Sequence, residues 1–299
     1  MRIVVTGREG QVVRCLIERA RNSDVQVVSL GRPELDLTDA SDSIVSAIVG
    51  ARPDLVVSAA AYTQVDRAET ERGLAFAVNE NGARAVARGA REAAVPVIHL
   101  STDYVFDGLK PSPYLEGDPT GPTGTYGASK LAGERAVLAE HQDSVVVRIA
   151  WVYSPFGTNF VKTMLRLAAD RGEVAVVADQ LGNPSSALDI ADGVIAIAHN
   201  LAASSGSELR GIFHMTGAGE ASWADFAERV FAASKAIGGP SANVRRIGVA
   251  DYPTMAKRPA NSRLDCSKLA RVHGVSPAAW ERSIVGVVKS LVSATRSGR

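Results

Sequence analysis

The sequence predicts an α/β protein with a doubly wound, Rossmann-like parallel sheet and a smaller C-terminal lobe. In the first half of the chain, short Val/Ile-rich runs alternate with longer amphipathic stretches. These runs are continuously apolar and do not alternate with polar residues, which is typical of strands buried on both faces of a parallel sheet. Regular alternation of strand and helix predicts helices on both faces of that sheet.

The predicted elements follow from this pattern in chain order. Strands are expected at residues 2–7, 25–30, 54–60, 95–102 and 144–150, and helices at 10–22, 39–51, 76–94 and 126–141. After about residue 155 the pattern loosens, with helices expected at 159–170 and 222–236 and strands at 173–179 and 211–217. Prolines break the chain between these later elements. We therefore expect one domain over residues 1–155 and a second lobe over 156–299, interleaved with the first.

Composition excludes several classes of protein. The chain has 299 residues, of which 46% are hydrophobic and 22% charged, as in ordinary globular proteins. Its net charge of +1 predicts no nucleic-acid or anionic-membrane partner. No apolar run reaches the length of a membrane span, and the first residues lack the apolar segment of a signal peptide. Cys15 and Cys266 form no Cys-x-x-Cys pair, so we expect a reduced, cytoplasmic protein.

A glycine turn follows the first predicted strand. Gly7 and Gly10 in "TGREGQVV" have the G-x-x-G spacing of a nucleotide-binding turn, in which the next helix directs its N–H groups at a pyrophosphate. Gln11 and Val12 open that helix and are assigned to the same cofactor site. Val13 stands where many such motifs carry a third glycine, whose role is close packing of helix on strand. The alternative is a plain strand–turn–helix connection that binds nothing.

The end of the second strand predicts the cofactor. Sites specific for NAD usually carry an acid there, which binds the ribose 2′-hydroxyl. This chain has Arg32, which can pair with a 2′-phosphate, so NADPH is favoured while NADH stays possible. Asp36 and Leu37 are expected to edge the adenine. Arg32 could also be an ordinary surface residue.

Three further residues predict carbonyl reduction. Tyr126 and Lys130 are four apart on a predicted helix and so share one face. A lysine cation favours a phenolate and lowers the tyrosine pKa from its usual value of about 10. Thr102 lies at the carboxyl end of the preceding strand, where ligands of open α/β sheets bind. The pair could then protonate a carbonyl oxygen while Thr102 shares that oxygen.

Together these residues resemble the extended short-chain dehydrogenase/reductase family, and within it the dTDP-4-dehydrorhamnose reductases. The resemblance runs nearly from end to end. Segments shared with the reductases include "RPDLVVSAAAYTQVDRAE", "STDYVFDG", "YGASKLAGE", "AWVYSPFGTNFVKTMLRLA", "DQLGNPSSALDIA" and "RPANSRLD". The glycine turn is common to the whole superfamily, whereas the "AWVY" and "RPANSRL" stretches are far more specific.

The resemblance implies that hydride moves from NAD(P)H to C4 of a dTDP-4-keto-6-deoxyhexose. Tyr126 would donate the proton, Lys130 would tune it and hold the nicotinamide ribose, and Thr102 would bind the keto oxygen or the donor. Residues after the third strand would line the cofactor, namely Ala60, Ala61 and Thr63.

The resemblance also assigns a substrate site in the dTDP-sugar reductases. The sugar-facing positions match Val65, Thr102, Tyr104, Tyr126 and Trp151. The flat apolar face of Trp151 would suit the C–H side of a sugar, although a buried core tryptophan is the alternative. Lys162 and Arg258 would bind the diphosphate, unless they are merely solvated charges.

The chain also departs from the family pattern. Gly124 replaces the usual asparagine two residues before the tyrosine, so a hydrogen bond made by that asparagine would be missing. Some relatives dimerise through magnesium held by glutamates, but the matching positions here are Cys15 and Leu188. Because magnesium requires oxygen ligands, we expect no metal site, and a homodimer, if formed, would have another basis.

Other functions remain open on the sequence alone. Sugar-nucleotide 4,6-dehydratases need an Asp-Glu pair after the threonine, whereas Asp103 and Tyr104 follow Thr102 here. Another sugar-nucleotide ketoreductase would share all of these residues. A binding protein without catalytic activity, like the regulatory subunit of methionine adenosyltransferase, is the alternative from a different class.

Overall fold

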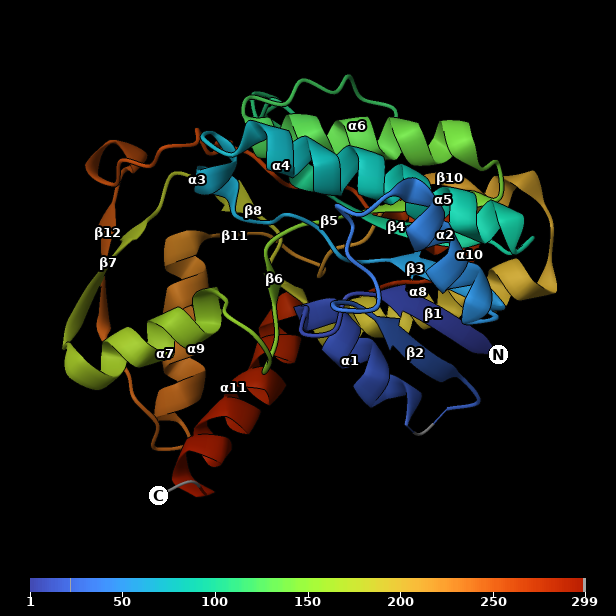
Figure 1. Cartoon of the computed structure of the whole chain (residues 1–299). Helices are drawn as coiled ribbons and strands as arrows, with labels where there is room; N and C mark the ends of the chain where they lie inside the picture. Colours follow the sequence, from blue (N-terminus) through green and yellow to red (C-terminus); the bar gives the residue numbers. More distant parts are fainter. Residues whose placement is uncertain (22, 298–299) are drawn as a thin grey trace.

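The computed structural model describes residues 1–21 and 23–297, and it is built around one six-stranded parallel sheet (Figure 1). The strand order is β10-β5-β4-β3-β1-β2, and every neighbouring pair is parallel. The strands are β1 (Arg2–Thr6), β2 (Gln26–Leu30), β3 (Leu55–Ser58), β4 (Val97–Thr102), β5 (Ser144–Ile149) and β10 (Gly211–His214). The predicted fold class is confirmed.

Helices cover both faces of the sheet because alternate strand residues point to opposite sides. One core joins Ile3, Val5 and Val57 to α1 (Gln11–Ala20), α8 (Ala187–Ala203) and α10 (Ser267–His273). The other joins Val56 and Val97 to α2 (Ser41–Gly50), α5 (Ala83–Glu92) and α6 (Thr125–Glu140). The short helices α3 (Val65–Ala68) and α4 (Arg72–Phe76) pack beside α6, and all carboxyl ends of the strands open toward one edge.

The C-terminal lobe has its own core and lies to the left in Figure 1. Its helices are α7 (Phe160–Asp170), α9 (Trp223–Lys235) and α11 (Trp280–Ser297). Its parallel pair is β7 (Glu173–Val177) with β12 (Asn243–Ile247). Two short pairs are also present. They are formed by β6 (Val152–Tyr153) with β9 (Ser185–Ser186) and by β8 (Leu181–Gly182) with β11 (Ala221–Ser222).

Several elements differ from the sequence-based expectation. The helix expected at 76–94 begins with a π-helical turn, η1 (Ala77–Gly82), and 3₁₀ turns occur at η2 (Asp103–Val105), η3 (Ser207–Leu209) and η4 (Val249–Asp251). The first helix ends at Ala20, and residue 22 of the expected span lies outside the described residues.

The sequence pattern missed α8, since this helix is apolar on most sides and short apolar runs do not distinguish helix from strand. Together, α8 and β10 complete the first lobe, so the sheet contains residues from both sides of position 155. No described helix has the length and apolar character needed to cross a membrane.

Candidate active site

The glycine turn lies between β1 and α1 at the carboxyl edge of the sheet. Gly7 has φ +97°, a conformation that favours glycine, and an added Cβ would lie 3.5 Å from the Ala60 Cβ. Gly10 is the N-cap of α1, which has no side-chain cap and no acidic residue in its first turn. The helix N–H groups are therefore left for an anion such as a pyrophosphate, which fits a dinucleotide.

The residues after the turn have separate tasks. Val12 and Val13 are buried in the core below the turn, so Val13 fills the packing position of the missing third glycine. The Gln11 side chain accepts hydrogen bonds from Ser154 Oγ (2.9 Å) and Asn159 Nδ2 (3.0 Å). Gln11 can therefore offer its backbone to a cofactor, while its side chain ties α1 to the start of α7.

The loop after β2 is exposed and carries ion pairs. Arg32 lies 2.6 Å from Asp36 through Nε and Oδ2, and its side chain is 76% exposed. Arg8, which the sequence analysis did not single out, pairs with Glu34 and packs against Gly31, where an added Cβ would lie 2.9 Å from its Cγ. Two guanidinium groups thus flank the end of β2, consistent with a 2′-phosphate site.

The other residues predicted to lie near the cofactor differ in how deeply they are buried. Leu37 is buried in the core under η1, so it supports this loop from below. Thr6 Oγ1 accepts hydrogen bonds from the N–H groups of Ala59 and Ala60, both at 3.0 Å, and so fixes the chain after β3 beside the glycine turn. Ala61 is half-buried and Thr63 is exposed on the same segment.

The end of β4 places two buried polar residues beside α6. The Thr102 hydroxyl lies 2.9 Å from Asp103 Oδ1 and accepts from the Tyr104 N–H at 3.3 Å. Both Thr102 and Asp103 are at most 5% exposed. Burial raises the pKa of Asp103 to about 7, against the opposing effect of its hydrogen bond with Thr102.

Tyr126 meets this strand end from the first turn of α6. Burial raises the pKa of its phenol, and an interaction with the Thr102 hydroxyl partly offsets that increase. The ring of Tyr104 stands edge-on to it, with ring centroids 5.5 Å apart. Arg258 reaches the Tyr104 hydroxyl at 3.4 Å and Asp66 at 2.6 Å. The structure therefore brings together four of the predicted site residues, Thr102, Tyr104, Tyr126 and Arg258.

Lys130 lies one turn further along α6 but turns toward the sheet. Its ammonium donates to the Leu100 carbonyl at 2.7 Å and lies 3.4 Å from His99 Nε2. Burial lowers its pKa to about 8, and the Glu134 carboxylate partly offsets this. Burial raises the pKa of Tyr126 in this arrangement, and the tuning of that pKa by Lys130 stays a prediction.

A buried ion pair holds α6 against β5. Arg148 donates to both carboxylate oxygens of Glu134, at 2.9 and 2.8 Å, and both side chains are 2% exposed. Ser101 also donates to Glu134. Glu134 lies one turn beyond Lys130 on the same face, so this pair fixes the helix face that carries Tyr126.

The departure at Gly124 has a structural compensation. Glu69 accepts hydrogen bonds from the Thr125 N–H (2.8 Å) and the Thr125 hydroxyl (3.1 Å), and so caps α6 from the loop after α3. A Cβ at position 124 would lie 2.8 Å from Glu69 Oε1, so glycine allows this approach. Glu69 therefore supplies the hydrogen bonds at the start of α6 from a distant part of the chain.

Trp151 lies between the lobes with a strained backbone. Its φ of +46° is rare for a bulky residue, and such strain persists where the surrounding structure imposes it. Its ring stacks on Trp223 at 3.6 Å and its Nε1 donates to Ser262 at 3.2 Å. Gly182 lies against the indole, since an added Cβ would be 2.3 Å from Cε2. Trp223 and Ser262 had no signal in the sequence, because they approach Trp151 only in the folded chain.

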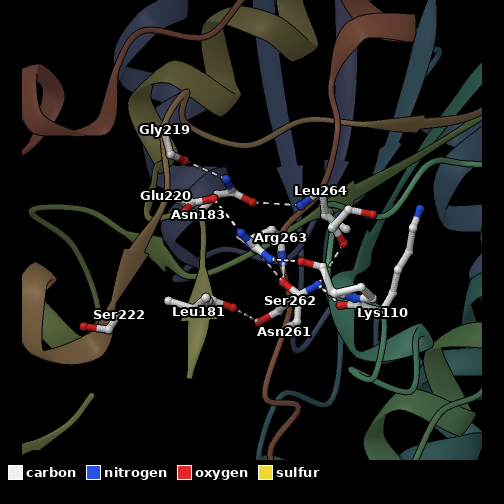
Figure 2. Close-up of polar contacts among 12 residues, drawn as sticks. Lys110, Leu181, Asn183, Gly219, Glu220, Ser222, Asn261, Ser262, Arg263 and Leu264 are labelled. Atoms are coloured by element: carbon white, nitrogen blue, oxygen red, sulfur yellow. Dashed lines mark hydrogen bonds and ion pairs between the residues drawn. The ribbon is translucent and has the colours of Figure 1, made fainter. Parts of the chain in front are cut away.

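The segment 258–265 crosses between the lobes, as Figure 2 shows for its second half. Asn261 Nδ2 donates to the Lys110 carbonyl (2.6 Å), and its Oδ1 accepts from Arg263 Nε (2.8 Å). The Leu264 N–H donates to Asn183 Oδ1 at 2.8 Å. These bonds position the segment, and with it Arg258, over the carboxyl edge of the sheet.

The remaining predicted residues are more peripheral. Val65 is half-buried at the start of α3, next to Asp66. Lys162 lies in the first turn of α7, which Asn159 caps.

Cys15 and Leu188 stand at the positions where some relatives are expected to bind magnesium. Cys15 is fully buried between α1 and the sheet, and burial raises the pKa of its thiol to about 12. Leu188 packs into the apolar cores. Within residues 1–21 and 23–297, no three His, Cys, Asp or Glu side chains are grouped to hold a metal ion.

Comparisons with known proteins agree with this geometry. A family model described as "RmlD substrate binding domain" matches residues 1–293. A dTDP-4-dehydrorhamnose reductase of Sinorhizobium fredii is 52% identical over 292 residues, covering 98% of each chain. The chain belongs to this reductase family. Its family assignment from sequence is confirmed.

Two solved structures of family members resemble the fold. The dTDP-4-dehydrorhamnose reductase of Clostridium acetobutylicum superposes with a TM-score of 0.90 at 32% identity, covering 97% of this chain and 99% of the other. That of Bacillus anthracis, solved in complex with NADP, gives a TM-score of 0.88 at 33% identity, covering 96% and 98%.

Proposed function

We propose that the protein reduces the C4 ketone of a dTDP-4-keto-6-deoxyhexose, converting dTDP-4-dehydrorhamnose to dTDP-L-rhamnose. The carrying observation is the cluster of Thr102, Tyr104, Tyr126 and Arg258 at the carboxyl edge of the sheet. Family membership supports the dTDP-sugar as substrate, and the NADP bound by the Bacillus anthracis relative supports NADPH.

When bound, NADPH supplies the hydride that reaches C4. The turn at Gly7 and Gly10 and the N-terminus of α1 would bind its pyrophosphate. Arg8 and Arg32 would bind the 2′-phosphate. Their present ion pairs with Glu34 and Asp36 would then be replaced by contacts with the phosphate. Ala60, Ala61 and Thr63 would line the nicotinamide side.

The protein's own groups would act on the ketone oxygen. Tyr126 donates the proton to this oxygen, since its buried phenol stays protonated until the acceptor is in place. Thr102 orients the phenol by hydrogen bonding. Lys130 would hold the nicotinamide ribose by releasing the Leu100 carbonyl.

The substrate would lie between the lobes. Val65, Tyr104 and Trp151 would contact the sugar, with the indole covering its C–H face. Arg258, already directed into the cluster by Asp66, and Lys162 on α7 would bind the diphosphate. Both lobes therefore supply charges that match a nucleoside diphosphate.

The deciding assay follows NADPH absorbance after adding dTDP-4-keto-6-deoxyglucose together with the 3,5-epimerase that forms dTDP-4-dehydrorhamnose. Oxidation of NADPH with appearance of dTDP-L-rhamnose is the expected result. NADPH binding without turnover would contradict the proposal and favour the non-catalytic alternative. Parallel assays with other keto-deoxysugars test the ketoreductase alternative.

The proposal places the enzyme in the cytoplasm, because Cys15 and Cys266 are free thiols and suit a reducing compartment. A homodimer is also proposed, formed without a bridging metal since Cys15 is buried, Leu188 is partly buried, and neither side chain offers an oxygen ligand. Light scattering of the purified chain measures this state.

A further inference from the structure

Asp103 is a buried acid beside the site for which the proposed mechanism has no role. It is 3% exposed in η2, directly after Thr102. Its Oδ1 lies 2.9 Å from Thr102 Oγ1, but its Oδ2 is buried with no hydrogen-bond partner among the described residues. An ionised carboxylate with one oxygen left unsatisfied in this way is costly, whereas a neutral acid tolerates it better.

Among the residues that the structure describes, no cation lies against this carboxyl group to offset that cost. The nearby titratable groups are Tyr104 on the same turn and Tyr126 on α6, both neutral phenols whose pKa values are raised by burial and, to a smaller extent, by Asp103. On the far side of Tyr104, the Arg258 guanidinium is paired with Asp66 of α3.

Two further groups lie near the cluster without neutralising Asp103. The Lys130 ammonium of α6 is bound by the Leu100 carbonyl. Hydrogen bonding by the Thr102 and Ser262 hydroxyls and by the backbone N–H groups of Asp103 and Tyr104 acts to lower the pKa of Asp103. The Ser262 hydroxyl is shared, since it also donates to the Leu181 carbonyl and accepts from Trp151 Nε1. Burial dominates and raises this pKa to about 7, so both protonation states are populated near neutral pH.

The protonation state of Asp103 controls the direction of the Thr102 hydroxyl. A hydroxyl group donates once and accepts twice, and Thr102 Oγ1 already accepts from the Tyr104 N–H. If Asp103 is ionised, Thr102 must donate to it, and its remaining lone pair takes the proton of Tyr126. If Asp103 is neutral, it donates to Thr102, which then donates toward Tyr126 and leaves the phenol proton free for the substrate.

We propose that Asp103 is a positioning residue that must be neutral, so that it donates a hydrogen bond to Thr102 and directs the Tyr126 proton at the ketone oxygen. The inference rests on the proposed reductase function. The 2.9 Å separation between Oδ1 and Oγ1 suits either direction of the bond, so the same geometry serves as an on and an off state.

The sign of the resulting pH dependence follows from the raised pKa. The neutral acid predominates below pH 7 and is lost as pH rises through 7, so turnover falls on the basic side. Two pH units above the pKa, one molecule in about 100 keeps the neutral acid, so kcat is expected to fall roughly 100-fold by pH 9.

The test compares kcat against pH from 5.5 to 9 for wild type, Asp103→Asn and Asp107→Asn. The asparagine amide at 103 donates to Thr102 as the neutral acid does but cannot ionise, so the fall in kcat near pH 7 should disappear while activity at pH 6 stays within about tenfold. Any fall that remains on the basic side should lie near pH 8, where Lys130 loses its charge. Asp107 is the matched control, because the hydrogen bond from Tyr114 lowers its pKa and it is ionised throughout. Asp107→Asn should therefore keep the fall near pH 7.

An Asp103→Asn profile that superimposes on that of wild type would overturn the inference. The Tyr104→Phe variant tests whether the neighbouring phenol causes the pH dependence. The fall in kcat near pH 7 should persist in this variant. A fall that vanishes there would be assigned to Tyr104 and would also overturn the inference.

A second measurement follows the carboxyl group of wild type directly and does not need the enzyme to turn over. The infrared carbonyl band of a protonated buried carboxylic acid should disappear from wild type as pH rises through about 7. Thr102→Val should shift this band, since it removes the hydrogen-bond partner. Absence of such a band at pH 5.5 would refute a neutral Asp103. If instead wild-type protein shows the band but does not oxidise NADPH with the dTDP-sugar, only the proposed function is refuted.

Discussion

Two strand ends at the same edge of the sheet carry the predicted chemistry in opposite surroundings. At the end of β4, Thr102, Asp103 and Tyr126 are enclosed by α6 and the segment 258–265, and burial shifts pKa values there. At the end of β2, an ion pair joins the exposed Arg32 to the half-buried Asp36. Because interactions in a buried site are less screened than those in water, the β4 end should control the rate and the β2 end only the choice of cofactor.

The largest effect tests the buried end at its proposed proton donor. Tyr126→Phe keeps the ring against Tyr104 but removes the acid, so kcat should fall about 10²–10⁴-fold while NADPH affinity, measured by calorimetry, stays nearly unchanged. Tyr252→Phe is the control, because this tyrosine is 58% exposed. Near-normal turnover of the Tyr126→Phe variant would remove Tyr126 from the mechanism.

The next effect concerns the support beneath the same site. Arg148→Met leaves the buried Glu134 carboxylate unpaired and should cost about 3–5 kcal/mol in the free energy of unfolding, measured with urea. Arg245→Met removes an ion pair whose two side chains are 59% and 60% exposed, and should cost at most about 1 kcal/mol. Equal losses in the two variants would contradict the contrast between buried and exposed charge.

A smaller effect is expected at the exposed end. Arg32→Asp should lower the ratio of kcat/KM for NADPH over NADH by roughly five- to tenfold, because it replaces attraction to a 2′-phosphate with repulsion and can bind a 2′-hydroxyl. Arg8→Asp should act in the same direction, since its guanidinium packs on Gly31. An unchanged ratio in both variants would show that this loop does not face the adenosine ribose.

The smallest effect is expected from metal removal. EDTA should change neither NADPH oxidation nor the oligomeric state seen by light scattering, since Cys15 and Leu188 offer no oxygen ligands. As the control, calcium or magnesium is added to the EDTA-treated enzyme and the two measurements are repeated. Activity that is lost with EDTA and restored by magnesium would contradict the proposal that hydride transfer here uses only Tyr126 and its neighbours.

Local pattern was sufficient for much of the molecule. Buried Val/Ile runs separated by amphipathic stretches predicted the parallel sheet and the helices of the first lobe, because strand and helix each bury apolar residues with their own period. The same reasoning placed Gly7, Thr102, Tyr126 and Lys130 at one edge, since carboxyl ends of parallel strands share an edge. It missed α8 because this helix is apolar on most sides and so carries only a weak periodic signal.

What the tertiary structure alone decided is the environment of each group. Glu69 caps α6 in place of a side chain at Gly124, Arg258 is aimed by Asp66, and Trp151 is stacked on Trp223, all across long separations in the chain. The same is true of the direction of Lys130 toward Leu100 and of the unsatisfied oxygen of Asp103. A sequence specifies which groups are present, but burial and the positions of distant partners set their pKa values and hydrogen bonds, and these exist only after the chain has folded.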